Sequence, residues 1–157
     1  MKFAIIGCGS IGQRHIRNLL QLGHEVVAWN RNKFRRDLVK KKFNIQTYKE
    51  LDQMLEITNL SGAFICSPNS FHLSHTRKVI NKNINVFIEK PLATKLQGLI
   101  AIEKEVKKKG LVNHVGSNMR FHFGPSTIKE YLEKGVIGKI LWANFWGGMY
   151  LPDWHPD

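Results

Sequence analysis

Short apolar runs alternate with longer amphipathic stretches along the first 115 residues. The short runs predict strands buried on both faces, and the longer stretches repeat apolar residues at helical spacing. The expected strands are residues 2–6, 25–29, 44–47, 62–66, 85–88 and 111–115. The expected helices are residues 11–22, 33–42, 49–55, 71–81 and 94–109. Strands joined through helices run parallel, so the pattern predicts an α/β fold, a doubly wound parallel sheet of the Rossmann type.

The pattern changes after Gly116. Residues 123–134 have helical spacing, and residues 139–146 alternate bulky side chains as a long, aromatic-rich strand would. We therefore expect one complete domain over residues 1–120 and, over residues 121–157, only the beginning of a second, α+β domain.

The chain has 157 residues, 43% of them hydrophobic, so it is long enough to bury a core and is neither disordered nor collagen-like. Its two cysteines, Cys8 and Cys66, are too few for a disulfide framework, and no cysteine or histidine spacing indicates a metal site. The apolar run at residues 3–6 is too short for a signal peptide or a membrane-spanning helix. We expect a cytoplasmic protein that binds neither a metal nor a membrane.

Lysine and arginine outnumber acidic residues by 24 to 12, which gives a formal charge of +12. The basic residues gather in residues 31–42 and 104–109, both expected helices, and neither run is regularly interleaved with aromatic side chains that stack on bases. Solvated helix faces explain this pattern, so we expect no nucleic acid as a partner. The positive field still favours anionic ligands, including a dinucleotide.

A glycine-rich turn follows the first expected strand and opens the first expected helix. Its candidate cofactor contacts are Gly7, Gly9, Ser10, Ile11 and Gly12. In a dinucleotide-binding turn, Gly7 would permit the tight bend, Gly9 would let the backbone approach a pyrophosphate, and Gly12 would let the helix pack on the strand. Free N–H groups at the helix start would then bind the anion. The alternative is that these glycines only shape the turn.

The second expected strand ends at Asn30 and Arg31, where an acidic residue would accept hydrogen bonds from the adenosine ribose. Asn30 carries no charge that would repel a 2′-phosphate. Arg31, with Arg35 and Arg36 one helical turn further on, could bind such a phosphate and lay a guanidinium over adenine. We therefore favour NADP over NAD as cofactor. The alternative is that these arginines are surface charges only.

Three further segments make the interpretation specific. They read Ile-Cys-Ser-Pro-Asn-Ser-Phe-His at residues 65–72, Phe-Ile-Glu-Lys-Pro-Leu at 87–92 and Asn-Met-Arg-Phe at 118–121. Together with the glycine turn, they make the chain resemble the Gfo/Idh/MocA family, which includes glucose–fructose oxidoreductases and inositol dehydrogenases. The resemblance covers essentially the whole chain, and Glu-Lys-Pro is its most specific part.

The resemblance implies an NAD(P)-dependent oxidoreductase that passes a hydride between nicotinamide and a sugar, a cyclitol or a related polyol. It implies that the nicotinamide end of the cofactor lies near Ser67, Pro68, Asn69, His72, Glu89 and Lys90. An alternative for His72 is a helix cap or a packing residue.

By the same resemblance, Lys90 contacts the reacting hydroxyl and takes part in its proton transfer, and the Lys90–Pro91 bond is cis. The chemistry agrees, because hydride loss from a carbinol requires that its hydroxyl proton be removed. Lys90 also lies just beyond an expected parallel strand, where open α/β sheets bind ligands. The alternative is a surface lysine in a turn. Arg120 would contact substrate or cofactor, or would pair with a carboxylate.

Members of the family usually continue into a second domain, whose open sheet covers the nicotinamide and supplies most substrate contacts. The Asp and His motif of that domain is not found in residues 121–157. We therefore expect the cofactor-binding half of a sugar-type dehydrogenase. The alternative is a truncated, catalytically inactive dinucleotide-binding module. Family dimers usually form through the second domain, so a homo-oligomer is left open.

Overall fold

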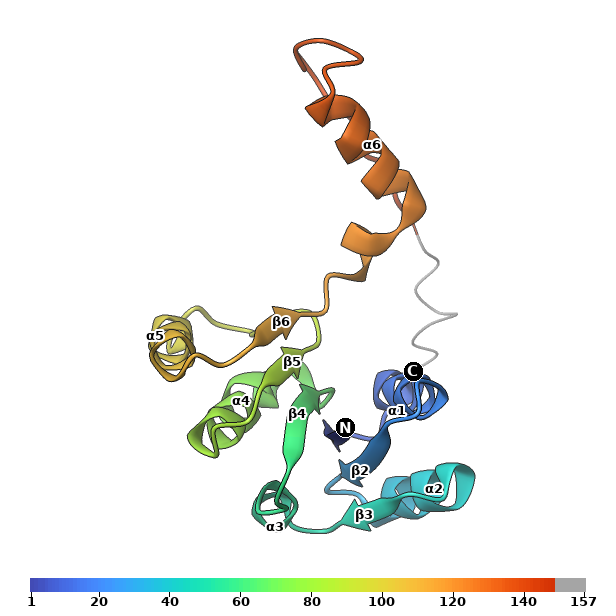
Figure 1. Ribbon diagram of the computed structural model, residues 1–157, viewed down its shortest axis with the longest axis vertical. Coiled ribbons are helices and arrows are strands. Elements are labelled where there is room, and N and C mark those ends of the chain that lie inside the picture. The colour runs from blue at the N-terminus through green and yellow to red at the C-terminus, as the bar shows by residue number, and fades with distance from the viewer. Residues whose placement is uncertain (149–157) are drawn as a thin grey trace. The chain divides into compact units, whose positions relative to one another are not determined.

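The computed structural model of the protein describes residues 1–148. The chain divides into two compact units, Met1–Ser117 and Asn118–Asp157. The first unit contains a six-stranded sheet in the order β3-β2-β1-β4-β5-β6, and all its strands are parallel (Figure 1). The strands are β1 (Lys2–Ile6), β2 (Glu25–Trp29), β3 (Gln46–Tyr48), β4 (Leu60–Ile65), β5 (Val86–Ile88) and β6 (Asn113–Val115).

Helices follow the strands in alternation. They are α1 (Ser10–Gln21), α2 (Lys33–Phe43), α3 (Leu51–Leu55), α4 (His72–Asn81) and α5 (Leu99–Lys109), with a 3-10 turn, η1 (Asn69–Phe71), before α4. The predicted doubly wound parallel sheet of the Rossmann type is confirmed. Element boundaries differ from the prediction by a few residues. The largest shift is at α5, which begins at Leu99 because Gly98 has a φ of +86°, outside the helical range.

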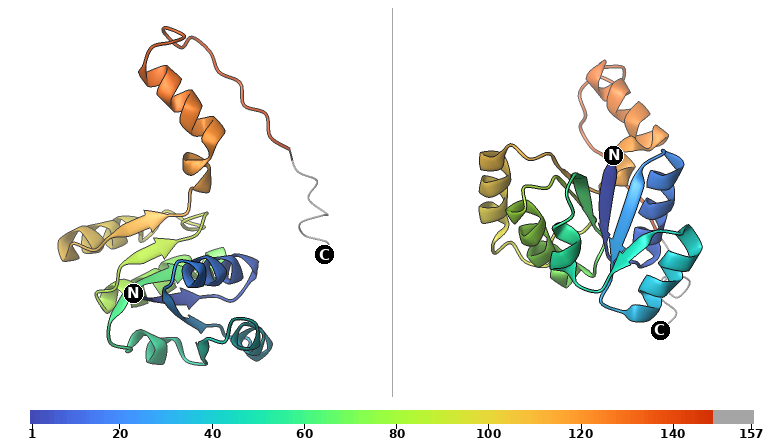
Figure 2. Two further views of the ribbon diagram at one scale, coloured as in Figure 1. Left: turned by 45° about the vertical axis from the view of Figure 1, so that its right-hand side comes forward. Right: turned by 60° about the horizontal axis from the view of Figure 1, so that its bottom comes forward.

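The helices cover the two faces of the sheet in two groups, because successive side chains of a strand point to opposite faces. On β1, Ile5 packs in the same buried cluster as residues of α1 and α2. Ala4 and Ile6 instead join the cluster of α3, α4 and α5. Figure 2 shows these two groups of helices on opposite sides of the sheet. Truncating Ile5, which is fully buried, to alanine would cost roughly 2–5 kcal/mol.

The order of the strands reverses at β1 and β4, and this point positions the site. Ile6 at the end of β1 pairs with Trp29 of β2 on one side and with Ile65 of β4 on the other. The chain turns to opposite faces of the sheet after these two strands, to α1 after β1 and to α4 after β4. Such a point leaves a crevice outside the carboxyl ends of the strands, where open α/β sheets bind ligands.

In its described part, the second unit contains a 3-10 turn, η2 (Asn118–Phe121), and one helix, α6 (Phe123–Glu133). Residues 134–148 contain neither helix nor strand, so the strand predicted over residues 139–146 is wrong. A strand requires a hydrogen-bonded neighbour, and no other strand lies among residues 118–148 to provide one. Alternation of side chains alone was therefore insufficient evidence for a strand.

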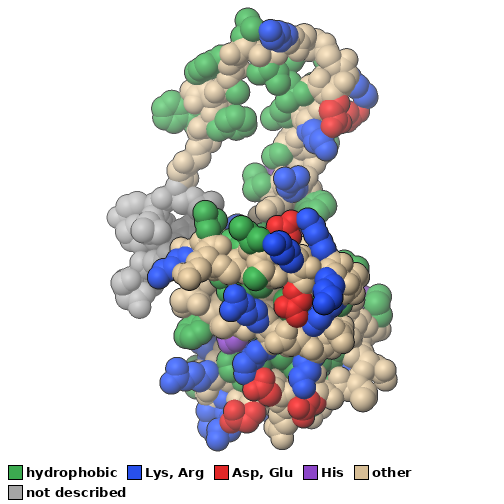
Figure 3. All heavy atoms as spheres, turned by 90° about the vertical axis from the view of Figure 1, so that its left-hand side faces the viewer, with side chains coloured by type: hydrophobic (Ala, Val, Ile, Leu, Met, Phe, Trp, Pro, Cys, Tyr) green, Lys and Arg blue, Asp and Glu red, His purple; other side chains and the backbone are tan. Residues whose placement is uncertain are grey.

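Charged side chains on the surface are mixed in sign. On the face that Figure 3 shows, lysines and arginines lie among aspartates and glutamates. Several form ion pairs one helical turn apart, such as Lys33 with Asp37 and Lys107 with Glu103. Exposed pairs of this kind contribute little stability. No helix in the described part of the chain is long and apolar enough to cross a bilayer.

Candidate functional site

The glycine turn after β1 is shaped by contacts that exclude side chains at two of its positions. A Cβ atom on Gly7 would lie 2.6 Å from the carbonyl carbon of Cys66, and Gly7 has a φ of +110°. A Cβ atom on Gly12 would lie 1.9 Å from the carbonyl oxygen of Gly7. Gly7 therefore lets the turn pass close to the end of β4, and Gly12 lets α1 pack on the turn.

Gly9 differs from these two glycines. Its Cβ would meet only the guanidinium of Arg35, at 3.3 Å, so no backbone packing explains the missing side chain. Gly9 is the N-cap of α1, and no side chain caps the helix. The first backbone bond of the helix runs from Gln13 N–H to the Gly9 carbonyl, which leaves the N–H groups of residues 10–12 without helical partners. Unoccupied N–H groups at a helix N-terminus attract anions.

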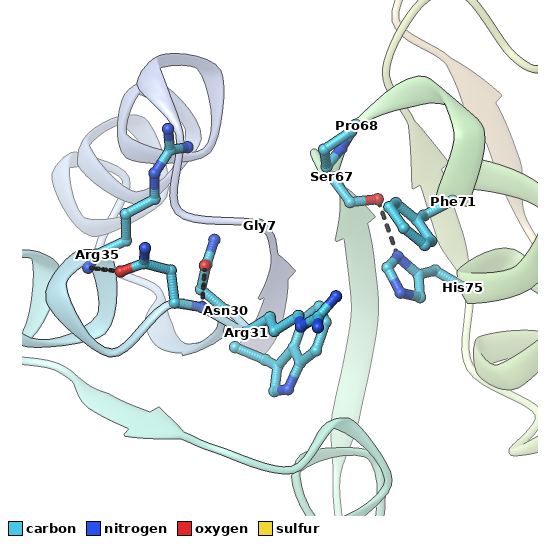
Figure 4. A pocket seen from close by; sticks show the side chains of 10 residues that line it. Gly7, Asn30, Arg31, Arg35, Ser67, Pro68, Phe71 and His75 are labelled. Carbon is cyan, nitrogen blue, oxygen red and sulfur yellow. Dashed lines mark hydrogen bonds between the residues drawn. The ribbon is translucent and has the colours of Figure 1, made fainter.

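A recess of about 550 Å³ opens beside this turn, between the ends of β1, β2 and β4 (Figure 4). It is lined by Gly7, Trp29, Asn30, Arg31, Asn32, Arg35, Ser67, Pro68, Phe71 and His75. Arg31 and Arg35 lie on one side of it, and Ser67, Phe71 and His75 lie on the other. The lining includes two cations and no carboxylate, which suits a ligand that is both aromatic and anionic.

The aromatic wall of the recess is fixed by hydrogen bonds and ring contacts. The Trp29 indole donates from Nε1 to the Lys49 carbonyl oxygen, 2.9 Å away. The His75 ring stacks on Phe71 and meets Trp29 edge-on, and its Nδ1 lies 2.9 Å from the Ser67 hydroxyl oxygen. Burial, with smaller contributions from the charges of Lys78 and His72, lowers the pKa of His75 to about 4. The His75 ring is therefore neutral at neutral pH.

The other wall is a turn at the end of β2. The Asn30 side-chain oxygen accepts a hydrogen bond from Asn32 N–H, and Asn32 in turn caps α2 by accepting from Arg35 N–H. Arg36 donates to the carbonyl oxygens of Asn30 and Arg31, at 2.7 and 3.0 Å. Arg36 thus braces the turn, whereas Arg31 and Arg35 are exposed and line the recess.

The two segments that follow β4 and β5 meet at His72. Its side chain is only 1% exposed, with Nε2 2.8 Å from the Ser67 carbonyl oxygen and Nδ1 2.9 Å from the Pro91 carbonyl oxygen. His72 does not line the recess, but it contacts the backbone of Ser67, which does. Pro68 and Asn69 are exposed beside it, and Pro68 lines the recess.

Glu89 is engaged by a residue that the sequence analysis did not identify. Its Oε1 lies 2.7 Å from His15 Nε2, and both side chains are 18% exposed. The His15 ring also packs against Phe64 and Phe87. A Cβ on Gly116 would lie 3.1 Å from Glu89 Oε2, so this carboxylate is enclosed from β6 as well.

Lys90 lies at the end of β5 and is exposed. The Lys90–Pro91 peptide bond is cis, as the family resemblance implies. The Lys90 backbone N–H donates to Glu89 Oε2, whereas no residue among 1–148 forms a hydrogen bond or ion pair with the Lys90 ammonium. Arg120 is exposed and belongs to the second unit, where its carbonyl oxygen accepts from the Ser126 hydroxyl.

The two cysteines have no features of a nucleophile. Burial raises the pKa of the Cys8 thiol to about 12, and burial also raises the pKa of Cys66. A thiol reacts as its thiolate, so both are inert at neutral pH. Residues 1–148 also contain no group of three His, Cys, Asp or Glu side chains that could hold a metal ion.

Comparison with known proteins identifies the chain's relatives. A model of the Gfo/Idh/MocA family, described as an oxidoreductase family with an NAD-binding Rossmann fold, matches residues 1–117. The chain belongs to this family. The myo-inositol 2-dehydrogenase of Thermotoga maritima is 29% identical over 143 residues, which cover 88% of this chain and 42% of that protein. An inositol 2-dehydrogenase/D-chiro-inositol 3-dehydrogenase of Lacticaseibacillus casei is 31% identical over 147 residues, covering 90% and 42%.

Solved structures agree with this family assignment. The crystal structure of myo-inositol 2-dehydrogenase from Lactobacillus plantarum superposes with a TM-score of 0.82 and 28% identity, over 89% of this chain and 43% of that one. The chain therefore spans about two fifths of the length of these family members. The features described above suit the family's nicotinamide cofactor, because the turn presents free N–H groups and an uncovered Gly9, and the recess combines aromatic rings with two guanidinium groups.

Five residues of the site were missed by the sequence analysis: His15, Trp29, Asn32, Phe71 and His75. Phe71 was within the quoted motif but was given no role. His75 lies three residues after His72, and this helical spacing was a signal that could have found it. For His15 the sequence held no signal, since its partner Glu89 is 74 residues away.

Proposed function

We propose that this chain binds a nicotinamide dinucleotide at the glycine turn and recess, and that it is the cofactor-binding part of an oxidoreductase acting on a sugar, a cyclitol or a related polyol. The observation that carries the proposal is Gly9, where a side chain is missing beside free helix N–H groups although no backbone packing requires it. The inositol dehydrogenases among the relatives support a cyclitol as the substrate class.

The recess supports a division of roles between its aromatic and its basic side chains. The rings of Trp29, Phe71 and His75 offer flat apolar surfaces for the adenine. Arg31 and Arg35 also line the recess, and their guanidinium groups would neutralise a phosphate on the adenosine ribose. Since no carboxylate lines the recess to repel that phosphate, we propose a preference for NADP over NAD.

Lys90 is the proposed proton-transfer residue. When bound, the nicotinamide accepts or supplies the hydride. The Lys90 amine would take the proton of the substrate hydroxyl during oxidation and return it during reduction. Its ammonium has no partner among residues 1–148, so it is available for a substrate oxygen. Glu89 is held by His15 next to it and would face the nicotinamide ribose.

A second function is favoured by the exposure of Lys90 and by the chain's length relative to its family. With Lys90 exposed and the chain spanning 42% of these relatives, a module that binds the dinucleotide without turnover is the alternative. Such a module would bind the cofactor normally but would not reduce it with any substrate.

Lys90→Ala tests the catalytic proposal. The chain is incubated with NADP+ or NAD+ and a panel of inositols and hexoses, and the absorbance of the reduced nicotinamide is followed. General acid–base catalysis contributes about 10²–10⁴-fold, so Lys90→Ala should lower turnover by that factor while leaving cofactor affinity unchanged. Lys95→Ala, in the same exposed segment, is the matched control. Binding without turnover on every substrate would favour the module instead.

A further inference from the structure

The His72 ring is hydrogen-bonded to two backbone carbonyl groups. It lies at the start of α4, is 1% exposed, and bridges the Ser67 and Pro91 carbonyl oxygens at 2.8 and 2.9 Å. Both distances are within the normal range for N–H···O hydrogen bonds. One side chain therefore ties the segment after β4 to the segment after β5.

The number of protons on the His72 ring follows from its two hydrogen-bond partners. A carbonyl oxygen only accepts, and a neutral imidazole donates from one nitrogen while the other presents a lone pair. A neutral His72 would thus set a nitrogen lone pair against a carbonyl oxygen at one of the two contacts. Only the imidazolium form donates to both. Burial by itself disfavours the charge, but the two charge-assisted hydrogen bonds exist only in the charged form.

We infer that His72 is a charged double donor that holds the Lys90-bearing segment against the wall of the recess, and that it is a positioning residue for Lys90. The inference rests on the proposed function only for the role of Lys90. Pro91 follows Lys90 directly, and Ser67 lines the recess, so the two hydrogen bonds of His72 fix the backbone that carries Lys90 relative to the backbone of the recess.

The titratable groups on the segments around His72 are compatible with its charge. On α4, His75 is neutral, because burial lowers its pKa to about 4. Before Ser67, the Cys66 thiol is neutral because burial raises its pKa. Before Pro91, the Glu89 carboxylate is bonded to His15, and Lys90 is exposed. Within residues 1–148, no carboxylate forms an ion pair with His72, so the two carbonyl dipoles are its counterpart.

Ser67 shows why the link between the two segments, which we call the His72 clamp, depends on His72 rather than on its neighbour His75. The Ser67 side-chain hydroxyl is bonded to His75, whereas the Ser67 carbonyl is bonded to His72. Removing His75 would free a side chain at the recess. Removing His72 would free the backbone on which both Ser67 and Lys90 are carried.

The direct test is nitrogen NMR of the whole chain at pH 7.5, with and without NAD+. An ordinary imidazole, with a pKa near 6.5, carries mostly a single ring proton at this pH. We expect both ring nitrogens of His72 to carry a proton. His24, which is partly exposed, is the internal reference. A His72 with one unprotonated nitrogen at pH 7.5 would overturn the inference.

A variant gives the functional readout. His72→Gln retains a donor but cannot bridge two acceptors, and His24→Gln is the matched control. ADP-ribose lacks the nicotinamide, so the ratio of its affinity to that of NAD+ isolates the end of the site near Lys90. We expect His72→Gln to weaken NAD+ by about tenfold, because the freed segment also carries Glu89, which would face the nicotinamide ribose, and to weaken ADP-ribose much less. Equal weakening of both ligands would contradict a positioning role.

The proposed function and the charged state of His72 can be contradicted independently. If NAD+ does not bind but both His72 nitrogens are protonated, the proposed function fails and the charged clamp stands. If NAD+ binds and His72 is neutral, the cofactor site stands and the clamp fails. Should His72→Gln not fold, the protonation state measured in the unaltered chain still decides.

Discussion

The recess beside the glycine turn and the end of β5 differ in how far hydrogen bonds fix their side chains. At the recess, side chains such as Trp29, Asn30 and His75 are fixed by hydrogen bonds within the first unit. At the end of β5, the backbone around Lys90 is held by Glu89 and His72, but the Lys90 ammonium has no partner among residues 1–148. The difference teaches that the candidate cofactor recess is preorganised, whereas the proposed reacting end fixes the backbone of Lys90 but not its amine.

This contrast separates binding from chemistry. Preorganised groups reduce the entropy that is lost when a ligand binds, so the recess should bind a dinucleotide without further protein. The proposed reaction also requires that a substrate be oriented against Lys90. Substitutions at the recess should therefore change affinity, and those at Lys90 should change turnover alone.

The largest expected effect at the glycine turn is that of Gly12→Ala. Its Cβ would lie 1.9 Å from the Gly7 carbonyl oxygen, so α1 must move from the turn. We expect a loss of roughly 3 kcal/mol, at the upper end for overpacking, and a fall in Tm of roughly 10 °C. Thermal unfolding followed by circular dichroism measures both. A Tm equal to that of the unaltered chain would show that the close packing of the turn is not real.

Gly9→Ala sharpens the comparison, because the same added methyl group meets only the Arg35 side chain. We expect a Tm within a few degrees of the unaltered chain and a Kd for NADP+ raised by at least about tenfold, since the methyl group would occupy the approach of the pyrophosphate. Titration calorimetry gives the Kd. Unchanged affinity would place the pyrophosphate elsewhere.

Arg31→Ala tests the cofactor preference with a smaller effect. If Arg31 neutralises a 2′-phosphate, its loss should weaken NADP+ by about tenfold and NAD+ by much less, as expected for one charge-assisted hydrogen bond. Lys33→Ala removes the same charge from a neighbouring residue that does not line the recess and is the control. Equal weakening of the two cofactors would contradict the 2′-phosphate proposal.

The smallest expected effect is a pH dependence of stability from His75. Its pKa is lowered to about 4 in the folded chain, so the unfolded chain, with a pKa near the ordinary 6.5, binds more protons between these values. Stability from this group is complete above about pH 6.5 and is lost as the pH falls toward 4. The ring is partly exposed, so we expect only about 1 kcal/mol of this loss, or a few degrees in Tm.

His75→Gln removes the titrating ring and so tests whether His75 causes this pH dependence. The difference in Tm between pH 7 and pH 5 should be smaller in His75→Gln than in the unaltered chain. Carboxylates titrate alike in both proteins and cancel in this comparison. The same pH sensitivity in both would show that the His75 ring is not desolvated in the recess.

Local sequence patterns predicted the strands, helices and glycine turn of the first unit, because each rests on the properties of neighbouring residues. The doubly wound sheet followed from the alternation of strands and helices. The strand expected over residues 139–146 failed because strand formation depends on a partner that the described part of the second unit does not offer.

The candidate site was predictable where a motif marks it and not where distant residues meet. Gly7, Gly9 and Gly12 could be given separate roles from spacing alone, and the packing of Gly7 and Gly12 agrees with those roles. The double contact of His72 joins residues 5 and 19 positions away, and the His15–Glu89 pair spans 74, so neither has a local signature. Such contacts become visible only once the sheet brings β4 and β5 together.

Titration calorimetry of the folded chain with NADP+ and NAD+ is the most direct test of the cofactor site. We expect saturable binding of at least one of them, abolished or strongly weakened in Gly9→Ala while circular dichroism shows that the variant is folded. Absence of heat with both cofactors, oxidised and reduced, from a demonstrably folded chain would contradict the account.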